Sequence, residues 1–218
     1  MTDQPLRAVF IAFAAMILLS TAGTARSQPQ DFDFYVLSLS WSPTYCSTRQ
    51  GERSSLQCGS DHAYGFIVHG LWPQFETGYP EFCRSREPGR VPRAVGETVL
   101  DIMPSMGLIG HQWRKHGSCT GLSQRDYFLQ TRKALEHIRL PDDLATTGRR
   151  LNLSADKIER KFLDANPGMS RRGIAATCEG RQLEEVRICF TKTFEFRECA
   201  EIDRRGCRLD RIDVPPTE

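Results

Sequence analysis

The sequence carries little net charge and no close pair of cysteines. Its 29 Lys and Arg residues nearly balance its 27 Asp and Glu residues, which leaves a formal net charge of +2. So small a charge gives no overall attraction for duplex nucleic acid, although it is compatible with a local basic cleft. Zinc sites usually contain two cysteines separated by two to four residues, and no such pair occurs in this sequence.

Long apolar runs are also scarce, and the one that occurs lies near the N-terminus. Residues 8–19 (AVFIAFAAMILL) are uncharged, follow Arg7, and precede small residues that end near Ser27. About 20 apolar residues are needed to span a bilayer, so this run fits a cleaved signal peptide better than an uncleaved anchor. We therefore expect residues 1–27 to be a signal peptide. Residues 28–218 should form a single domain that is periplasmic or secreted and has no membrane contact.

Eight cysteines follow this predicted signal peptide. An even number of cysteines after an export signal indicates four disulfides in an oxidising compartment. Their spacing does not by itself decide which cysteines pair. The residues are Cys46, Cys58, Cys83, Cys119, Cys178, Cys189, Cys199 and Cys207.

Strands and helices are predicted in an irregular order along the chain. Hydrophobic periodicity indicates strands at residues 31–41, 63–69, 182–191 and 193–198 and helices at 93–103, 108–116, 123–140 and 154–165. Residues 42–60 and 75–90 are polar and aperiodic, and we expect them to be loops. Because strands and helices do not alternate regularly, an α+β fold is favoured over a doubly wound sheet.

Imidazole and ammonium groups are concentrated in two short segments. Residues 111–119 (HQWRKHGSC) contain two of the five histidines and one of the five lysines, and residues 66–73 (FIVHGLWP) contain His69. In a helix, Gln112 and His116 share one face, and His111 and Lys115 share another. Such a set suits acid–base chemistry on a phosphate, because one imidazole can take a proton while another gives one.

Each of these segments also has a simpler interpretation. The helix could be an amphipathic surface helix, and His69 could be a hydrogen-bonded histidine at the end of a buried strand. Trp72 and Tyr79 are more often packing residues than platforms that stack on a base. Motif matches of this kind carry a risk of false positives.

The two segments resemble the two active-site signatures of the ribonuclease T2 family. The resemblance extends to residues 41–46 (WSPTYC), to residues 103–105 (MPS), which are similar to bacterial members, and to a helix that ends in residues 165–168 (ANPG). It covers roughly residues 32–207. It implies an α+β fold in which helices pack against a central antiparallel sheet. It also implies a metal-independent endoribonuclease without a cofactor, which acts as a monomer on single-stranded RNA and not on DNA.

The resemblance further implies a role for each site residue. His116 would take the proton of the 2′-OH and His69 would protonate the leaving 5′-oxygen. The product would be a 2′,3′-cyclic phosphate and then a 3′-phosphate. Lys115 would stabilise the charged phosphorane, His111 would bind phosphate, and Trp72 and Tyr79 would help to hold a base.

This sequence departs from the family's pattern at two site positions. Gln112 stands where the second signature usually has glutamate, so it can donate a hydrogen bond but cannot carry negative charge. Gln74 stands where some fungal members place an acidic residue that reads the base, so the family's base preference does not carry over.

The family's arrangement also implies a disulfide pairing. It ties Cys83 to Cys119 and nests Cys189–Cys199 within Cys178–Cys207, which leaves Cys46 with Cys58. Two other functions stay open at this point. One is an RNA-binding or inhibitory relative with impaired catalysis, for which Gln112 is the support. The other is a zinc-dependent hydrolase that uses the histidines and a cysteine.

Overall fold

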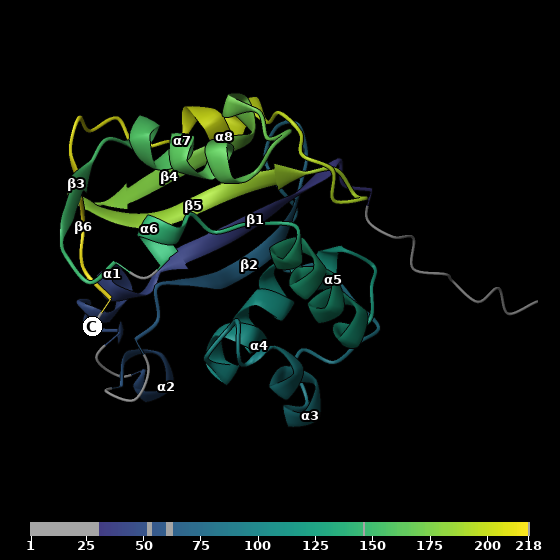
Figure 1. The fold of residues 1–218 in the computed structure, drawn as a ribbon. Coiled ribbons are helices and arrows are strands. Elements are labelled where there is room, and N and C mark those ends of the chain that lie inside the picture. Colours follow the sequence, from purple (N-terminus) through teal and green to yellow (C-terminus); the bar gives the residue numbers. More distant parts are fainter. Residues whose placement is uncertain (1–30, 52–53, 60–62, 146, 218) are drawn as a thin grey trace, which may run out of the picture.

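A six-stranded sheet runs through the middle of the molecule (Figure 1). The computed structural model describes residues 31–51, 54–59, 63–145 and 147–217, so the expected signal peptide lies outside the described residues. The strand order is β2-β1-β5-β6-β3, and β4 also pairs with β5. All pairs are antiparallel except the parallel contact between β5 and β6. The strands are β1 (Phe34–Trp41), β2 (Phe66–Gln74), β3 (Leu151–Leu153), β4 (Ile174–Glu179), β5 (Gln182–Phe190) and β6 (Ile212–Val214).

Helices gather in separate groups around this sheet. Figure 1 shows α7 and α8 beside β4, and α3, α4 and α5 grouped beyond β2. None of the helices in the described ranges is both long and apolar enough to cross a membrane. The helices are α1 (Ser42–Cys46), α2 (Ser55–Cys58), α3 (Arg93–Gly96), α4 (Met106–Lys115), α5 (Gln124–Glu136), α6 (Asp142–Ala145), α7 (Ala155–Ala165) and α8 (Ala200–Arg204).

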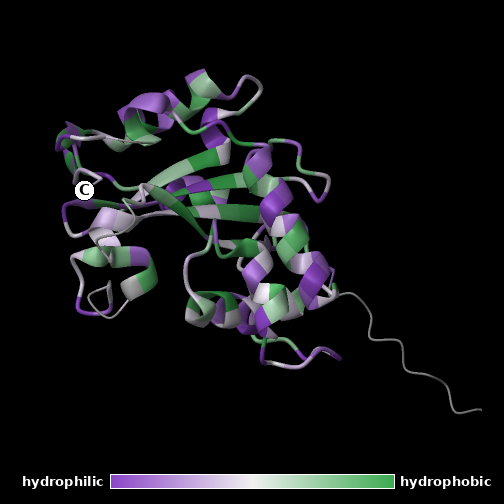
Figure 2. Cartoon of the chain, turned by 60° about the horizontal axis from the view of Figure 1, so that its bottom comes forward, coloured by the Kyte–Doolittle hydropathy of each residue, from purple (hydrophilic) through white to green (hydrophobic). Residues whose placement is uncertain are grey.

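The core follows from the alternation of side chains along β1. Tyr35, Leu37, Leu39 and Trp41 point to one face of the sheet and join the main core with side chains of α4, α5 and α7. The other face begins with Phe34 and Val36, which pack against α8. Hydrophobic residues accordingly concentrate on the strands and polar residues on the outer sides of the helices (Figure 2). The expected α+β architecture is confirmed.

Two helices begin where the sequence predicts. Ser123 precedes α5 and its hydroxyl accepts a hydrogen bond from the backbone N–H of Asp126 over 3.1 Å. Ser154 caps α7 in the same way with the N–H of Lys157. A serine at this position satisfies one of the free N–H groups at the start of a helix. These caps explain why local sequence predicts the N-terminal ends of both helices.

Several predicted elements need correction. Residues 193–198 do not form a strand. The chain turns there with Phe194 at φ 66°, the Cys189–Cys199 disulfide closes the loop, and one isolated bridge joins Phe196 to Phe190. Residues 42–60 contain the short helices α1 and α2 rather than only loop, and residues 93–103 form α3 followed by a 3₁₀ turn at Glu97–Val99.

Other strands are longer than expected or were missed. β2 continues past His69 to Gln74, because it pairs with β1 from Phe66 to Gln74 at every residue except His69. β3, β4 and β6 were not predicted. β3 and β6 have three residues each, too few to show a period, and β4 (IAATCE) does not alternate in polarity.

The four disulfides pair as the family's arrangement implies. The bonds are Cys46–Cys58, Cys83–Cys119, Cys178–Cys207 and Cys189–Cys199. No free cysteine remains. Bridges of this kind restrict the unfolded chain and thereby stabilise the fold.

Candidate active site

The two signature segments meet at a cavity of about 270 Å³. It lies between β2, α4, β5, α8 and the loop that follows β2. All eight residues that the sequence singles out for the site line it. These are His69, Trp72, Gln74, Tyr79, His111, Gln112, Lys115 and His116, and the structure adds Glu184, Glu185, Arg187, Ile202 and Arg205.

His69 lies at an irregularity in the pairing of β2 with β1. Ser38 pairs with Gly70 and the next residue of β1, Leu39, pairs with Val68, so His69 has no partner on β1. A bulge of this kind changes the direction of a side chain and is frequent beside active sites. It explains how a strand with buried neighbours on both sides presents a half-buried imidazole to the cavity.

Glu185 of β5 is the main site residue that the sequence analysis missed. Its carboxylate is 3% exposed and bonds through Oε1 to Nδ1 of His69 and through Oε2 to the guanidinium of Arg187 at 2.8 Å. Burial alone would raise the pKa of Glu185, but the hydrogen bonds and charges of His69 and Arg187 lower it to about 2. The available signal was the pair of opposite charges, Glu185 and Arg187, two residues apart and therefore on one face of the strand.

Helix α4 places the second signature segment against the cavity. It begins at Ser105, whose hydroxyl accepts a hydrogen bond from the N–H of Leu108 over 3.2 Å. Gln112 and His116 are buried on one face as predicted, Lys115 is half-buried and His111 is exposed, and all four line the cavity. The helix ends at Lys115, and a 3₁₀ turn at Gly117–Cys119 follows.

His116 lies in surroundings that disfavour a positive charge. Burial is the first cause and the charge of Lys115 the second, and together they lower the pKa of His116 from 6.5 to about 3. Its buried Nδ1 has no hydrogen-bond partner among the described residues, and its ring stacks on Trp72 with 5.2 Å between centroids. The imidazole is therefore neutral at ordinary pH and able to accept a proton.

Trp72 and Gln112 join the two segments directly. The indole Nε1 of Trp72 donates to Oε1 of Gln112 over 2.8 Å. Gly70 makes room for this contact, because a Cβ there would lie 2.1 Å from Oε1 of Gln112 and 2.5 Å from Nε1 of Trp72. Any larger residue at position 70 would have to displace both side chains.

Lys115 and Tyr79 lie close together in the lining of the cavity. The ammonium of Lys115 lies 5.9 Å from the centre of the Tyr79 ring and 3.6 Å from Oε2 of Glu81. Tyr79 is 37% exposed, so its ring is accessible to a ligand. Its loop is held by the N–H of Gly78, which donates to Glu201 of α8 over 2.6 Å.

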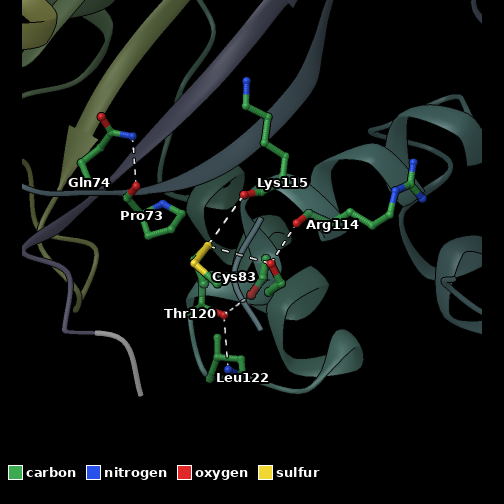
Figure 3. Close-up of a disulfide and its surroundings, with 10 residues drawn as sticks. Pro73, Gln74, Cys83, Arg114, Lys115, Thr120 and Leu122 are labelled. Carbon is green, nitrogen blue, oxygen red and sulfur yellow. Dashed lines mark hydrogen bonds between the residues drawn. A yellow bond between two sulfur atoms is a disulfide. The ribbon is translucent and has the colours of Figure 1, made fainter. Parts of the chain in front are cut away.

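Gln74 lines the cavity but is already engaged. Its side chain is buried, and Nε2 donates to the carbonyl of Pro73 over 3.0 Å (Figure 3). The amide oxygen is the part of this side chain that remains for a ligand.

The Cys83–Cys119 disulfide ties the loop after β2 to the end of α4. In Figure 3 the side chain of Lys115 extends away from this disulfide. The N–H of Phe82 adds a hydrogen bond to the carbonyl of Lys115 over 2.9 Å. The bridge therefore holds the loop that carries Tyr79 close to Lys115 and His116.

A second cavity of about 530 Å³ adjoins the first and shares His69 and His111 with it. Its other lining residues come from β1, β2, the α1–α2 region and the start of α4, and include Ser40, Tyr45, Gln57 and Leu108. His69 and His111 therefore stand between two hollows, each with room for part of a ligand.

The described residues contain no group of three or more His, Cys, Asp or Glu side chains placed to hold a metal ion. Every cysteine of the chain is part of a disulfide. The zinc-hydrolase alternative consequently has no thiolate to use as a ligand.

Comparison with known proteins gives consistent matches. The model of the ribonuclease T2 family matches residues 32–199. A ribonuclease of Aeromonas hydrophila is 34% identical over 187 residues, which cover 79% of this chain and 78% of that protein. A probable ribonuclease of Haemophilus influenzae is 30% identical over 179 residues, which cover 77% of this chain and 61% of that protein.

Solved structures show the same fold. RNase NT in complex with 5′-AMP is 28% identical with a TM-score of 0.66, and the match covers 86% of this chain and 100% of that one. An RNase-related protein from Calystegia sepium has a TM-score of 0.68 at 18% identity, over 86% of this chain and 99% of that one. Residues 32–199, which the family model matches, contain both signature segments and the whole of β5. The chain belongs to the ribonuclease T2 family and is an RNA-cleaving enzyme.

Proposed function

We propose that the enzyme cleaves single-stranded RNA by transphosphorylation without a metal ion. The observation that carries this proposal is the contrast between two imidazoles in one cavity. His69 is bonded to an ionised carboxylate, whereas His116 is buried beside the cation Lys115. Pairs of titratable groups whose surroundings differ in this way are typical of an acid and a base that work together.

In this mechanism His116 is the base. Its neutral ring takes the proton from the 2′-OH, and the resulting oxygen attacks phosphorus. His69 donates its proton to the 5′-oxygen as the P–O bond breaks, which gives a 2′,3′-cyclic phosphate. In a slower second step the roles reverse, water opens the ring, and a 3′-phosphate results.

The other site residues bind charge and base. Lys115 stabilises the charged phosphorane, and His111 binds a phosphate oxygen. The amide nitrogen of Gln112 donates a hydrogen bond to an oxygen of the same phosphate. Tyr79 and Trp72 hold the base next to the scissile phosphate, and Gln74 offers its amide oxygen there.

The proposal also covers the compartment, the oligomeric state and the partners of the enzyme. Four disulfides require an oxidising compartment, and the predicted signal peptide supports export, so we place the mature enzyme in the periplasm or outside the cell. We expect it to act as a monomer, to ignore DNA, and to have no contact with a membrane.

Incubation of the mature chain with RNA and with DNA, in the presence of a strong chelator, tests the proposal. We expect RNA to be cut to fragments that end in 2′,3′-cyclic phosphate, and DNA to stay intact because it lacks the 2′-OH. Loss of cleavage in chelator would support the zinc alternative. RNA binding without cleavage would support the alternative of an impaired or inhibitory relative.

A further inference from the structure

A buried carboxylate lies between two cations on the cavity side of β5. Glu185 uses one carboxylate oxygen for Nδ1 of His69 and the other for Nε and a terminal nitrogen of Arg187. At 3% exposure it has almost no contact with solvent. A carboxylate this deeply buried is stable only when paired and hydrogen-bonded, and both of its oxygens meet that condition.

Arg187 also reaches the base-binding side of the cavity. Its guanidinium carbon lies 5.3 Å from the centre of the Trp72 ring. In the sheet, Arg187 is the partner of Ser38 on β1 and Glu185 is the partner of Ser40. Both side chains therefore lie on the same face of the sheet, toward which the bulge in β2 directs His69. The three residues come from two strands that are separated by β1, and local sequence does not bring them together.

A purely structural ion pair would need only Glu185 and Arg187. The hydrogen bond between the second carboxylate oxygen and His69 is not required for such an ion pair. It occupies Nδ1 of the imidazole and leaves Nε2 as the nitrogen that can donate to a leaving oxygen. An acceptor on one ring nitrogen selects the tautomer and the orientation of the ring.

We propose that Glu185 is the positioning residue for His69, and that Arg187 keeps Glu185 ionised while His69 gives up its proton. This inference rests on the proposed function. When His69 protonates the 5′-oxygen, the proton leaves Nε2, the P–O5′ bond breaks, and Nδ1–H stays bonded to Glu185. The carboxylate takes no proton at any stage, because Arg187 still neutralises it. In the second step Nε2 regains a proton from the attacking water.

Other charged groups face this assembly and bear on its pH dependence. Glu184 is adjacent on β5, where burial and the charge of Glu185 raise its pKa, and Thr177 donates to it over 3.1 Å. The cations around the cavity come from α4 and α8. They are Lys115 and Arg205, of which Arg205 is paired with Glu201, and the imidazoles of His111 and His116 lie beside them with lowered pKa values.

The test compares two substrates in variants of the full-length mature enzyme. One substrate is an RNA dinucleotide, whose 5′-oxygen must be protonated to leave. The other is a nucleoside 3′-nitrophenyl phosphate, whose leaving group departs without a proton. We expect Glu185→Gln to lower kcat/KM on the dinucleotide by on the order of 10- to 100-fold, as for other residues that orient a histidine. The nitrophenyl ester should be cleaved at nearly the normal rate.

Two further variants make the result specific. Glu185→Asp keeps the charge and should recover part of the activity. Glu159→Gln, which removes a partly buried carboxylate of α7 that accepts from the N–H of Ala176, should leave both substrates unaffected.

The outcomes separate this inference from the proposed function. Equal losses on both substrates, or no loss on the dinucleotide, would overturn the positioning role while the wild type still cleaves RNA. A wild-type enzyme that cleaves neither substrate would overturn the proposed function and this inference with it. If Glu185→Gln does not fold, the double variant Glu185→Gln/Arg187→Gln removes both charges and is judged by the same two-substrate comparison.

Discussion

Trp72 and Gln112 are joined by a hydrogen bond in which the indole nitrogen donates to the amide oxygen over 2.8 Å. An indole N–H can only donate, so the oxygen of Gln112 must face Trp72. The amide nitrogen is then the atom that remains to donate to a phosphoryl oxygen. Glutamine therefore preserves the link between the two signature segments at a position where the family usually has glutamate.

Replacement of Gln112 tests this link. Gln112→Glu restores the usual family residue and still accepts from Trp72, so we expect activity to stay intact or to rise. Gln112→Leu leaves the indole N–H of Trp72 unpaired and should cost about 1–3 kcal/mol of stability together with activity. Steady-state cleavage of RNA and thermal unfolding measure the two effects. A large loss in Gln112→Glu with full activity in Gln112→Leu would contradict this account.

Gly70→Ala tests whether the same contact needs a residue without a side chain. The added Cβ would lie within 2.5 Å of both Gln112 and Trp72 and must push them apart. We expect a loss of activity on the order of 10²-fold, because catalytic geometry tolerates little displacement. Gly148→Ala is the matched control, since a Cβ there meets nothing within 4 Å. Equal activity of the two variants would show that the contact is dispensable.

His69→Ala and His116→Ala test the division of roles. General acid–base catalysis contributes typically about 10² to 10⁴ in rate, so each variant should lose at least that much while remaining folded. A substrate whose leaving group needs no proton should partly rescue His69→Ala. It should not rescue His116→Ala, because the 2′-OH must still lose its proton. Equal rescue of both variants would refute the assignment of acid and base.

The pH dependence of kcat/KM should reflect the buried position of His116. The base works only when neutral, and burial and Lys115 hold the pKa of His116 at about 3. The acidic limb of the profile should therefore lie far below the ordinary histidine value of 6.5. Lys115→Met removes one cause of the lowered pKa and should move this limb to higher pH. An acidic limb near 6.5 in the wild type would contradict the prediction.

The Cys83–Cys119 bridge should matter for activity as well as for stability. Loss of a native disulfide typically costs about 2–5 kcal/mol, and the double variant Cys83→Ser/Cys119→Ser should show a decrease of that order in urea unfolding. Its activity should fall further than stability alone explains, because the loop with Tyr79 is freed from the end of α4. Cys178→Ser/Cys207→Ser serves as the comparison, since neither of these cysteines lines either cavity. Identical activities would argue against a role in holding the site.

Local sequence was sufficient for part of this protein. The alternation of β1, the starts of α5 and α7, and the shared face of Gln112 and His116 depend on residues a few positions apart, and these features were predicted. The two signature segments and the cysteines further identified the family, and with it eight of the residues that line the cavity.

Only the tertiary structure decided which distant residues contact these side chains in the site. The partnership of His69 with Glu185 joins residues 116 positions apart, and it depends on a bulge in β2 and on the placement of β5 beside β1. The strand expected at residues 193–198 failed because a disulfide and a left-handed Phe194 turn the chain there. Strand neighbours, bulges and buried charge pairs arise from contacts between distant segments, and the periodicity of a single segment does not contain them.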